Sequence, residues 1–250
     1  MSEAPLLPAG TLILVRECEG RAPELLMVQR AESMAFGASA WVFPGGRVDP
    51  EDVALAAAIL GEDGPLDDYA ARVAAIRETI EEAGIAIAID PLPDANLLGR
   101  IRAALHEGEG FAAVLDRHAL RLVPEALLPF SRWQPSHAVP RRFDTRFYIA
   151  RATADAAFEA DGTETIAICW TAPGAMLARD DARIMFPTAC NLRRIAALPD
   201  FTALAAHAAL FPASFVSPEI REIEGLRYLC VPEDQGYEGM RMILESALRA

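Results

Sequence analysis

The stretch RETIEEAG, residues 77–84, constrains this chain more than any other part of its sequence. Glu78, Glu81 and Glu82 stand at i, i+3 and i+4, so a helix would project their carboxylates from one face. Gly84 follows where a helix commonly ends, because glycine adopts the left-handed cap conformation without a steric cost. Gathered carboxylates repel one another unless a cation lies among them, and hard divalent ions prefer oxygen ligands. Such a triplet alone is more often a solvated acidic face, so the rest of the chain must decide between the two.

The charge balance narrows the class of ligand. The 250 residues include 23 basic and 36 acidic side chains, which gives a net charge of −13. Binding to a nucleic-acid backbone rewards clustered positive charge, so we expect no nucleic-acid partner. Every basic residue is arginine, and the lack of lysine excludes a pyridoxal phosphate Schiff base and a lysine-containing phosphate loop. A phosphate substrate would therefore need metal ions or an arginine cluster.

The cysteines and the hydropathy indicate a cytoplasmic protein. Four widely spaced cysteines form no C-x-x-C pair, which is typical of reduced thiols and not of a zinc site or a disulfide framework. No apolar run approaches the ~18 residues of a membrane span. The N-terminus lacks the basic start and apolar run of a signal peptide. We therefore expect no membrane partner.

Alternating strand and helix patterns predict an α/β or α+β domain with a mixed sheet. Strands are expected, the first two as a hairpin, over 10–18, 25–31, 41–43, 85–89, 130–134, 143–150 and 163–171. Helices are expected over 50–60, 69–83, 94–106, 111–120, 172–179, 187–198, 200–209 and 239–249. Asp49 is expected to cap the first helix, and Asp67 or Asp68 the second. A last hairpin is expected to turn at Glu224 and Gly225.

The segments FPGG (43–46) and RETIEEAGI (77–85) together resemble the Nudix box, G-x5-E-x7-R-E-U-x-E-E-x-G-U, where U is a bulky aliphatic residue. The matching positions are Gly46, Arg77, Glu78, Glu81, Glu82, Gly84 and Ile85. Asp52 stands in place of the first glutamate, and Thr79 in place of an aliphatic residue. Asp52 and Arg77 are 25 positions apart where the motif has 8, so an insertion of 17 residues splits the box.

The wider pattern is similar to one branch of that family, the peroxisomal coenzyme A diphosphatases and their bacterial relatives. The positions that match this branch are 41–46, Asp49, Asp52, 75–84, 141–147, Trp170, Pro187, Thr188 and Leu192. The resemblance implies a Nudix-type α/β/α sandwich with a mixed sheet, as a single domain over 1–250. Its core would span about 8–200, with a helical insertion at about 94–128 and a C-terminal extension at about 210–250.

The resemblance also implies metal-dependent hydrolysis of a diphosphate bond in a nucleoside diphosphate linked to another group. Coenzyme A or an acyl-coenzyme A is the leading substrate by the branch pattern. ADP-ribose, a dinucleotide and a nucleoside triphosphate remain alternatives. A non-catalytic Nudix module that senses a nucleotide is an alternative of another class.

The implied roles centre on the acidic triplet. Glu81 and Glu82 would bind Mg²⁺ or Mn²⁺, with Glu78 as a ligand or general base and a backbone carbonyl near Gly46 as a further ligand. Glu164 is an alternative base. Arg77 would orient the box carboxylates through ion pairs, and Asp52 could be its partner.

Substrate binding is expected to involve the densest basic cluster of the chain. It contains Arg141, Arg142 and Arg146, and strand alternation would place the last two opposite Phe143. Guanidinium groups suit phosphate, and an aromatic ring can stack on a base, so these residues and Arg30 are candidates. The alternative is that the arginines pair with local acids. The C-terminal hairpin and final helix could supply a homodimer interface.

Overall fold

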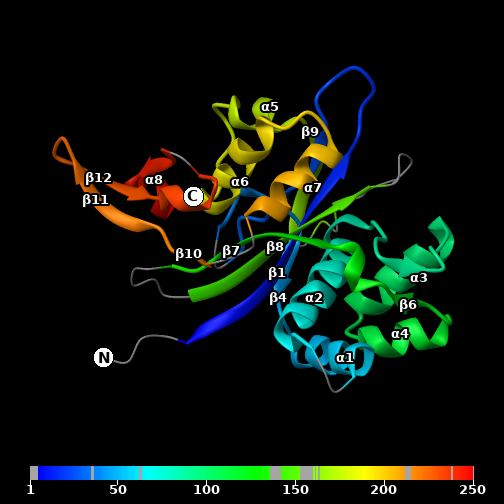
Figure 1. Ribbon diagram of the computed structural model, residues 1–250. Coiled ribbons are helices and arrows are strands. Elements are labelled where there is room, and N and C mark those ends of the chain that lie inside the picture. Colours follow the sequence, from blue (N-terminus) through cyan, green and yellow to red (C-terminus); the bar gives the residue numbers. More distant parts are fainter. Residues whose placement is uncertain are drawn as a thin grey trace.

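The computed structural model describes residues 5–34, 37–61, 64–135, 142–152, 160, 162, 164–211, 215–237 and 239–249. One mixed eight-stranded sheet lies between two layers of helices (Figure 1). The expected α/β/α sandwich is therefore confirmed. No helix in this described part of the chain is both long and apolar enough to cross a membrane.

The sheet has the strand order β10-β7-β8-β1-β2-β3, and in addition β4 pairs with β1 and β9 with β2. Its strands are β1 (Leu6–Arg16), β2 (Glu24–Arg30), β3 (Trp41–Val42), β4 (Gly45–Arg47), β7 (Leu128–Trp133), β8 (Arg142–Arg151), β9 (Thr165–Thr171) and β10 (Phe215–Val216). The predicted hairpin of β1 and β2 is confirmed by their antiparallel pairing. At the centre, β1 and β8 run parallel to each other.

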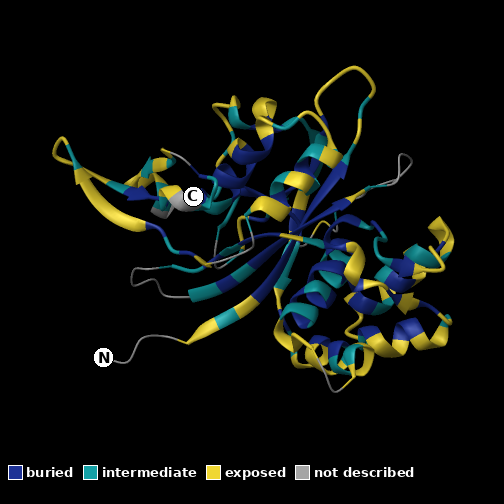
Figure 2. Cartoon of the chain, in the orientation of Figure 1, coloured by how far each residue is buried: buried dark blue, intermediate teal, exposed yellow. Residues whose placement is uncertain are grey.

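The sheet separates two apolar cores. One lies under α1 (Pro50–Leu60), α2 (Leu66–Ala83), α3 (Ala95–His106) and α4 (Phe111–Arg117). The other lies under α5 (Pro173–Leu177), α6 (Phe186–Ala196) and α7 (Phe201–Leu210). Residues alternate along β1, so Leu12 and Leu14 enter the first core while Ile13 and Val15 enter the second. Figure 2 shows the buried residues on the central strands and the inner helix faces.

Helix α2, which carries the acidic triplet, packs closely across β1 at Gly10. A β-carbon at this position would lie 1.8 Å from the Ala71 carbonyl oxygen, so only glycine permits this approach. The predicted apolar stripe of α2 is fully buried; it contains Val73, Ile76 and Ile80. Gly84 ends the helix in the predicted left-handed conformation, with φ 65° and ψ 30°. Packing at Gly10 thus fixes the helix relative to the sheet.

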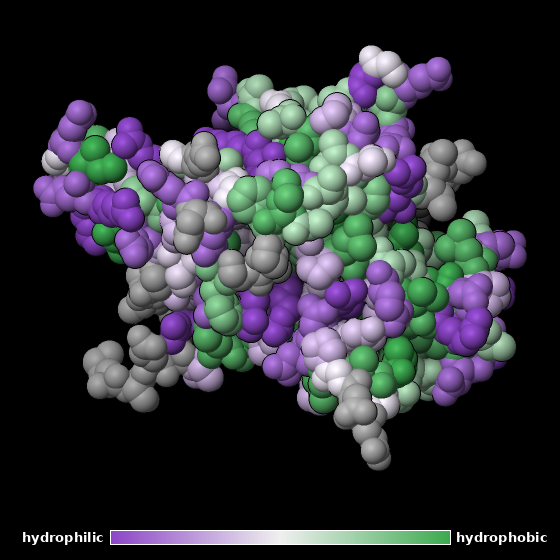
Figure 3. All heavy atoms as spheres, in the orientation of Figure 1, coloured by the Kyte–Doolittle hydropathy of each residue, from purple (hydrophilic) through white to green (hydrophobic). Residues whose placement is uncertain are grey.

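Two additions extend the sandwich. Next to α3 and α4 lie a two-stranded sheet of β5 (Ile89–Asp90) and β6 (Arg121–Leu122) and the short 3-10 helix η1 (Pro124–Ala126). Towards the C-terminus, a three-stranded sheet contains β11 (Glu219–Ile223), β12 (Leu226–Cys230) and β13 (Arg241–Ile243), with η2 (Glu233–Gln235) and α8 (Leu244–Arg249) beside it. The predicted turn at Glu224 and Gly225 is confirmed. The β11–β12 hairpin projects from the body (Figure 1) and is mostly hydrophilic in Figure 3.

Three predictions of local structure are wrong. The strand expected over 85–89 is reduced to its last residue, because Ile85 and Ile89 pack into the core under α2 and Ala88 adopts a positive φ of 55°. The helix expected over 239–249 begins only at Leu244, since 241–243 pair with β12 as a strand. The second helix begins at Leu66, so Asp67 and Asp68 lie in its first turn and do not cap it.

Arg194 of α6 anchors the C-terminal part of the chain. Its guanidinium donates hydrogen bonds to His207 Nε2 of α7 at 2.8 Å and to Tyr237 Oη at 3.2 Å. Tyr237 Oη in turn donates to Asn191 Oδ1. Arg194 and Tyr237 are both buried, so this polar network joins α6, α7 and the C-terminal segment within the second core.

This contact predicts a pH dependence of stability. Burial and the Arg194 charge lower the pKa of His207. In agreement with this, its Nε2 can accept the hydrogen bond from Arg194 only while it is unprotonated. A histidine with a lowered folded-state pKa stabilises fully above the unfolded value of 6.5, and this contribution is lost as the pH falls. Urea unfolding above and below pH 6.5 should show that the free energy of unfolding falls more steeply with decreasing pH for wild type than for His207→Gln. His106→Gln, at an exposed position, is the control; equal slopes in wild type and His207→Gln would contradict the assignment.

Candidate active site

A cavity of about 720 Å³ opens where α2 and the glycine turn meet the sheet. Its wall combines residues of β1, β2, β4, β8 and α2 with the start of α6. Six of the predicted site residues line it, together with Gly45: Arg30, Gly46, Glu78, Glu82, Phe143 and Glu164. Residues that are far apart in sequence therefore share one concave surface.

The glycine pair brings the backbone into contact with two of the glutamates. The Gly45 N–H donates a hydrogen bond to Glu82 Oε2 at 3.0 Å. At Gly46, a β-carbon would lie 2.1 Å from Glu78 Oε1, so any side chain there would collide with that carboxylate. The first half of the split motif thus holds one carboxylate and leaves space for another.

Gly46→Ala is expected to displace Glu78 and to reduce kcat by about 100-fold, because Glu78 is a predicted catalytic group and a shift near 1 Å in such a group costs about that much. Steady-state kinetics of the purified variants measure the effect. Gly99→Ala on α3 is the matched control, since a β-carbon there meets no atom within 4 Å. Wild-type activity in Gly46→Ala would show that the contact with Glu78 has no role in the reaction.

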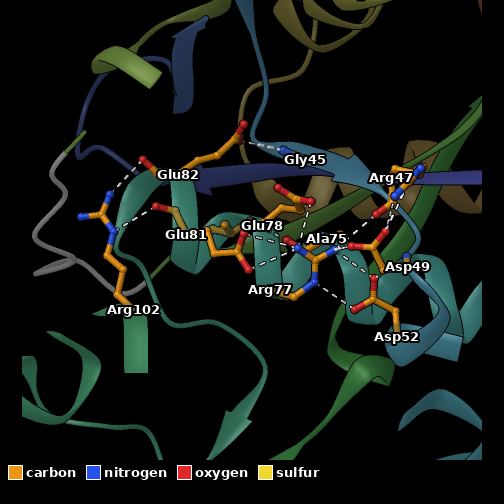
Figure 4. A network of polar contacts seen from close by, with 11 residues as sticks. Gly45, Arg47, Asp49, Asp52, Ala75, Arg77, Glu78, Glu81, Glu82 and Arg102 are labelled. Atoms are coloured by element: carbon orange, nitrogen blue, oxygen red, sulfur yellow. Dashed lines mark hydrogen bonds and ion pairs between the residues drawn. The ribbon is translucent and has the colours of Figure 1, made fainter. Parts of the chain in front are cut away.

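Arg77 joins the two halves of the motif (Figure 4). Its Nε and Nη2 atoms donate to Asp52 Oδ1 and Oδ2 at 3.0 and 2.9 Å, a bidentate ion pair that confirms the suggested partner. Nη1 donates to Glu78 Oε1 at 3.0 Å and to Glu81 Oε1 at 3.2 Å. Burial lowers the pKa of Arg77, but the hydrogen bond to Asp52 and the neighbouring carboxylate charges outweigh this and raise it. Arg77 therefore stays charged between α1 and the acidic face of α2.

The electrostatics of Glu78 differ from those of an ordinary surface carboxylate. Burial raises its pKa, the Arg77 charge opposes this, and the nearby Glu81 charge raises it further, to about 7. Glu82 is only 4% exposed. Carboxylates that are close together at a largely buried wall repel one another, and a bound cation would reduce this repulsion.

The donor set suits a hard divalent cation, although the described residues contain no ready-made group of three His, Cys, Asp or Glu side chains that could hold a metal ion. Glu78 and Glu82 offer carboxylate oxygens at the cavity wall, and Gly46 lies beside them. Glu81 contacts Arg77 and is not among the described residues that line the cavity. A three-carboxylate site would need Glu81 to turn from Arg77 towards the cavity.

Arg102 of α3 ties the helical insertion to the end of α2. Its Nε donates to the Glu81 carbonyl at 2.9 Å and its Nη2 to the Glu82 carbonyl at 3.2 Å (Figure 4). Carbonyls in the last turn of a helix lack helical partners and favour a nearby cation. The sequence pattern gives no signal for this residue, because nothing in its spacing links it to the motif.

Arg102→Ala is expected to lower kcat by about tenfold, with a smaller change in KM, because two hydrogen bonds from a charged donor are lost beside Glu82. Arg102→Lys should restore part of the loss. Arg100→Ala, at an exposed position on the same helix, is the matched control. Equal kinetics in the Arg100 and Arg102 variants would show that the contact does not position α2.

The described members of the predicted arginine cluster are absent from the wall of this cavity. Phe143, Thr145 and Phe147 line it, whereas Arg142 and Arg146 are not among the described residues of its wall. Strand alternation was expected to place Arg142 and Arg146 opposite Phe143, and Arg146 indeed lines a different cavity from Phe143. A role of these arginines in substrate binding stays a prediction. Arg141 lies outside the described residues.

Some polar residues of the wall were not predicted from the sequence. They are Thr11, Ser33, Arg47 and Thr145. Leu7, Ala9 and Thr11 line the cavity from every second position of β1, so strand alternation could have identified Thr11. No comparable sequence signal distinguishes Ser33.

Comparison with known proteins defines the class and the family. The sequence matches the NUDIX domain over residues 6–191. The crystal structure of a NUDIX hydrolase from Alicyclobacillus acidocaldarius has a TM-score of 0.71 and 29% sequence identity, covering 82% of this chain and 97% of that chain. The protein is thus a hydrolase acting on phosphorus-containing anhydrides. The chain belongs to the Nudix family, whose enzymes use divalent metal ions.

More distant structures show lower similarity. An Ap4A hydrolase binary complex from C. elegans has a TM-score of 0.43 and 19% identity, over 77% of this chain and 96% of that chain. The NUDIX domain of Shewanella oneidensis NrtR, complexed with ADP ribose, has a TM-score of 0.40 and 14% identity, over 72% and 80%. No curated protein sequence matches the chain significantly.

Proposed function

We propose that this enzyme cleaves the diphosphate bond of a nucleoside diphosphate linked to another group, with coenzyme A or an acyl-coenzyme A as the leading substrate. The observation that carries the proposal is the cavity in which Glu78 and Glu82 lie beside the glycine turn, with Arg30 on the same wall. Its volume of about 720 Å³ falls in the range of small-molecule sites. The preference for coenzyme A rests on the resemblance to the split-box branch.

In this proposal, Glu78, Glu81, Glu82 and a carbonyl near Gly46 hold Mg²⁺ or Mn²⁺. The bound ion supplies neutralisation of the diphosphate charge and a lower pKa for a coordinated water. Arg77 positions the carboxylates through its ion pairs and does not contact the substrate.

The remaining wall residues have separate proposed roles. As the alternative to metal binding, Glu78, whose pKa is raised to about 7, would accept the proton of the attacking water, and Glu164 is the other candidate base. Arg30 would bind a phosphate group, and Phe143 would stack on the base of the nucleotide. We further propose a cytoplasmic enzyme, in which any homodimer forms through the projecting C-terminal sheet.

A substrate panel tests the proposal. The purified protein is incubated with Mg²⁺ or Mn²⁺ and, separately, coenzyme A, ADP-ribose, NADH and nucleoside triphosphates. Formation of 3′,5′-ADP and phosphopantetheine would support the coenzyme A assignment. Inert coenzyme A with rapid turnover of another compound would transfer the assignment to that substrate class. Saturable binding without turnover of any compound would favour the nucleotide-sensing alternative.

A further inference from the structure

A second cavity, of about 510 Å³, lies between the start of α2 and strands β7 and β8. Arg132, Arg146 and Tyr148 line it from the strands, and Asp67 and Asp68 from the first turn of α2. The two cavities lie on opposite sides of β8, since Arg146 and Tyr148 alternate with Thr145 and Phe147. Among the residues that the structure describes, Phe147 is the one that borders both.

Arg146 is a buried cation whose charge is only partly compensated by the nearby Asp144 carboxylate. Its residue is only 8% exposed, and it makes no hydrogen bond or ion pair with any part of the chain that the structure describes. The arginine directly opposite on β7, Arg132, is already engaged, because its Nε and Nη2 donate to Asp144 Oδ1 and Oδ2 at 2.8 and 2.5 Å. Two guanidinium groups thus share one carboxylate on this wall. An incompletely compensated buried charge is unfavourable, and a guanidinium aimed into a cavity favours an oxyanion there.

The α2 wall limits the charge of the ligand. Asp68 is engaged, because it accepts hydrogen bonds from Arg72 Nε at 2.7 Å and from Tyr148 Oη at 2.8 Å. Asp67 is exposed and makes no hydrogen bond or ion pair with the described residues. A ligand with one anionic group could face Arg146 and direct a hydroxyl or ammonium group towards Asp67. A second anionic group would meet repulsion from Asp67 and from the net charge of −13.

We propose that this cavity is a second ligand site for a small monoanion that also carries a hydroxyl or ammonium group, the chemistry of a hydroxy acid or an amino acid. Arg146 binds the carboxylate through its planar fork, and Asp67 accepts a hydrogen bond from the other end. Pro65, Pro129 and Phe147 provide apolar contacts for the carbon skeleton. The site is independent of the diphosphate reaction.

Arginine side-chain NMR tests the proposal on the intact protein. The Nε–H signal of Arg146 is assigned by its loss in Arg146→Gln, and glycolate, glycine, acetate and citrate are titrated separately. Glycolate or glycine should shift the Arg146 signal saturably at millimolar concentration. The signal of Arg151, an exposed residue at the other end of β8, should stay unchanged. An Arg146 signal that none of the probes shifts, or that citrate shifts more strongly than glycolate or glycine, would overturn the proposal.

Two variants locate the binding groups. Arg146→Gln should weaken glycolate binding by about tenfold or more in calorimetry, whereas Arg151→Gln should not. Asp67→Asn should weaken glycine more than acetate, because acetate has no donor for Asp67. Equal glycolate affinity of wild type and Arg146→Gln would overturn the proposed site. An unchanged preference for glycine over acetate in Asp67→Asn would overturn the role of Asp67. Should Arg146→Gln not fold, Arg146→Lys keeps the positive charge but lacks the Nε–H signal, so it supplies the assignment for the wild-type titration.

Discussion

Glu82→Gln is expected to reduce hydrolysis by about 1000-fold while the fold is retained. The amide keeps the size of the side chain, and its oxygen can still accept the hydrogen bond from the Gly45 N–H. What is lost is a negative charge at the cavity wall, where only 4% of the residue is exposed. The affinity for Mn²⁺, measured by electron paramagnetic resonance, should fall together with kcat.

Glu107→Gln provides the control for this substitution, because Glu107 is an exposed glutamate that follows α3. It should retain wild-type activity and metal affinity. An active Glu82→Gln variant would refute the proposed metal site. If Glu82→Gln binds Mn²⁺ normally but shows no turnover, the role of Glu82 would be proton transfer and not metal binding.

Arg77→Gln is expected to lower the free energy of unfolding by about 3–5 kcal/mol, the usual cost of removing one partner from a buried ion pair. Asp52 would remain with its side chain 1% exposed and without its bidentate partner. Glu78 and Glu81 would lose the charge between them, so activity should also fall. Urea unfolding and steady-state kinetics measure the two effects.

The double variant Asp52→Asn/Arg77→Gln separates stability from positioning. Replacing both partners removes the uncompensated charge, so most of the lost stability should return. Activity should remain low, because no cation then lies between Glu78 and Glu81. Recovery of activity together with stability would mean that Arg77 serves only to stabilise the packing of α1 on α2.

The strongest periodic signals in the sequence predicted their elements well. The stripe of Val73, Ile76 and Ile80 became the buried face of α2, and Gly84 ended the helix as expected. The pairing of Arg77 with Asp52 also followed from the motif, although the two residues are 25 positions apart. These features are local, or depend on a pattern with a known spatial arrangement, so the sequence contains enough information for them.

Features set by tertiary contacts could not be predicted in this way. The strand at 241–243 forms because β12 offers hydrogen-bonding partners, which a helical propensity scale does not include. Arg102 reaches the end of α2 only because the insertion packs there. The alternation of β8 was visible in the sequence, but which of its faces borders the candidate active-site cavity depends on how α2 lies across Gly10.

The ion pair between Asp52 of α1 and Arg77 of α2 joins the two halves of the Nudix motif through the packing of two helices. The two halves therefore need not be close together in the sequence. Asp52 and Arg77 meet because two helices lie against each other, so the connection between Leu60 and Leu66 is free to vary in length. Each doubling of a flexible connection costs only about 0.6 kcal/mol in closure entropy. An interrupted motif of this kind should therefore tolerate further insertions at the same point. Relatives with such insertions would be recognised by residues that meet in space rather than by a fixed interval along the chain.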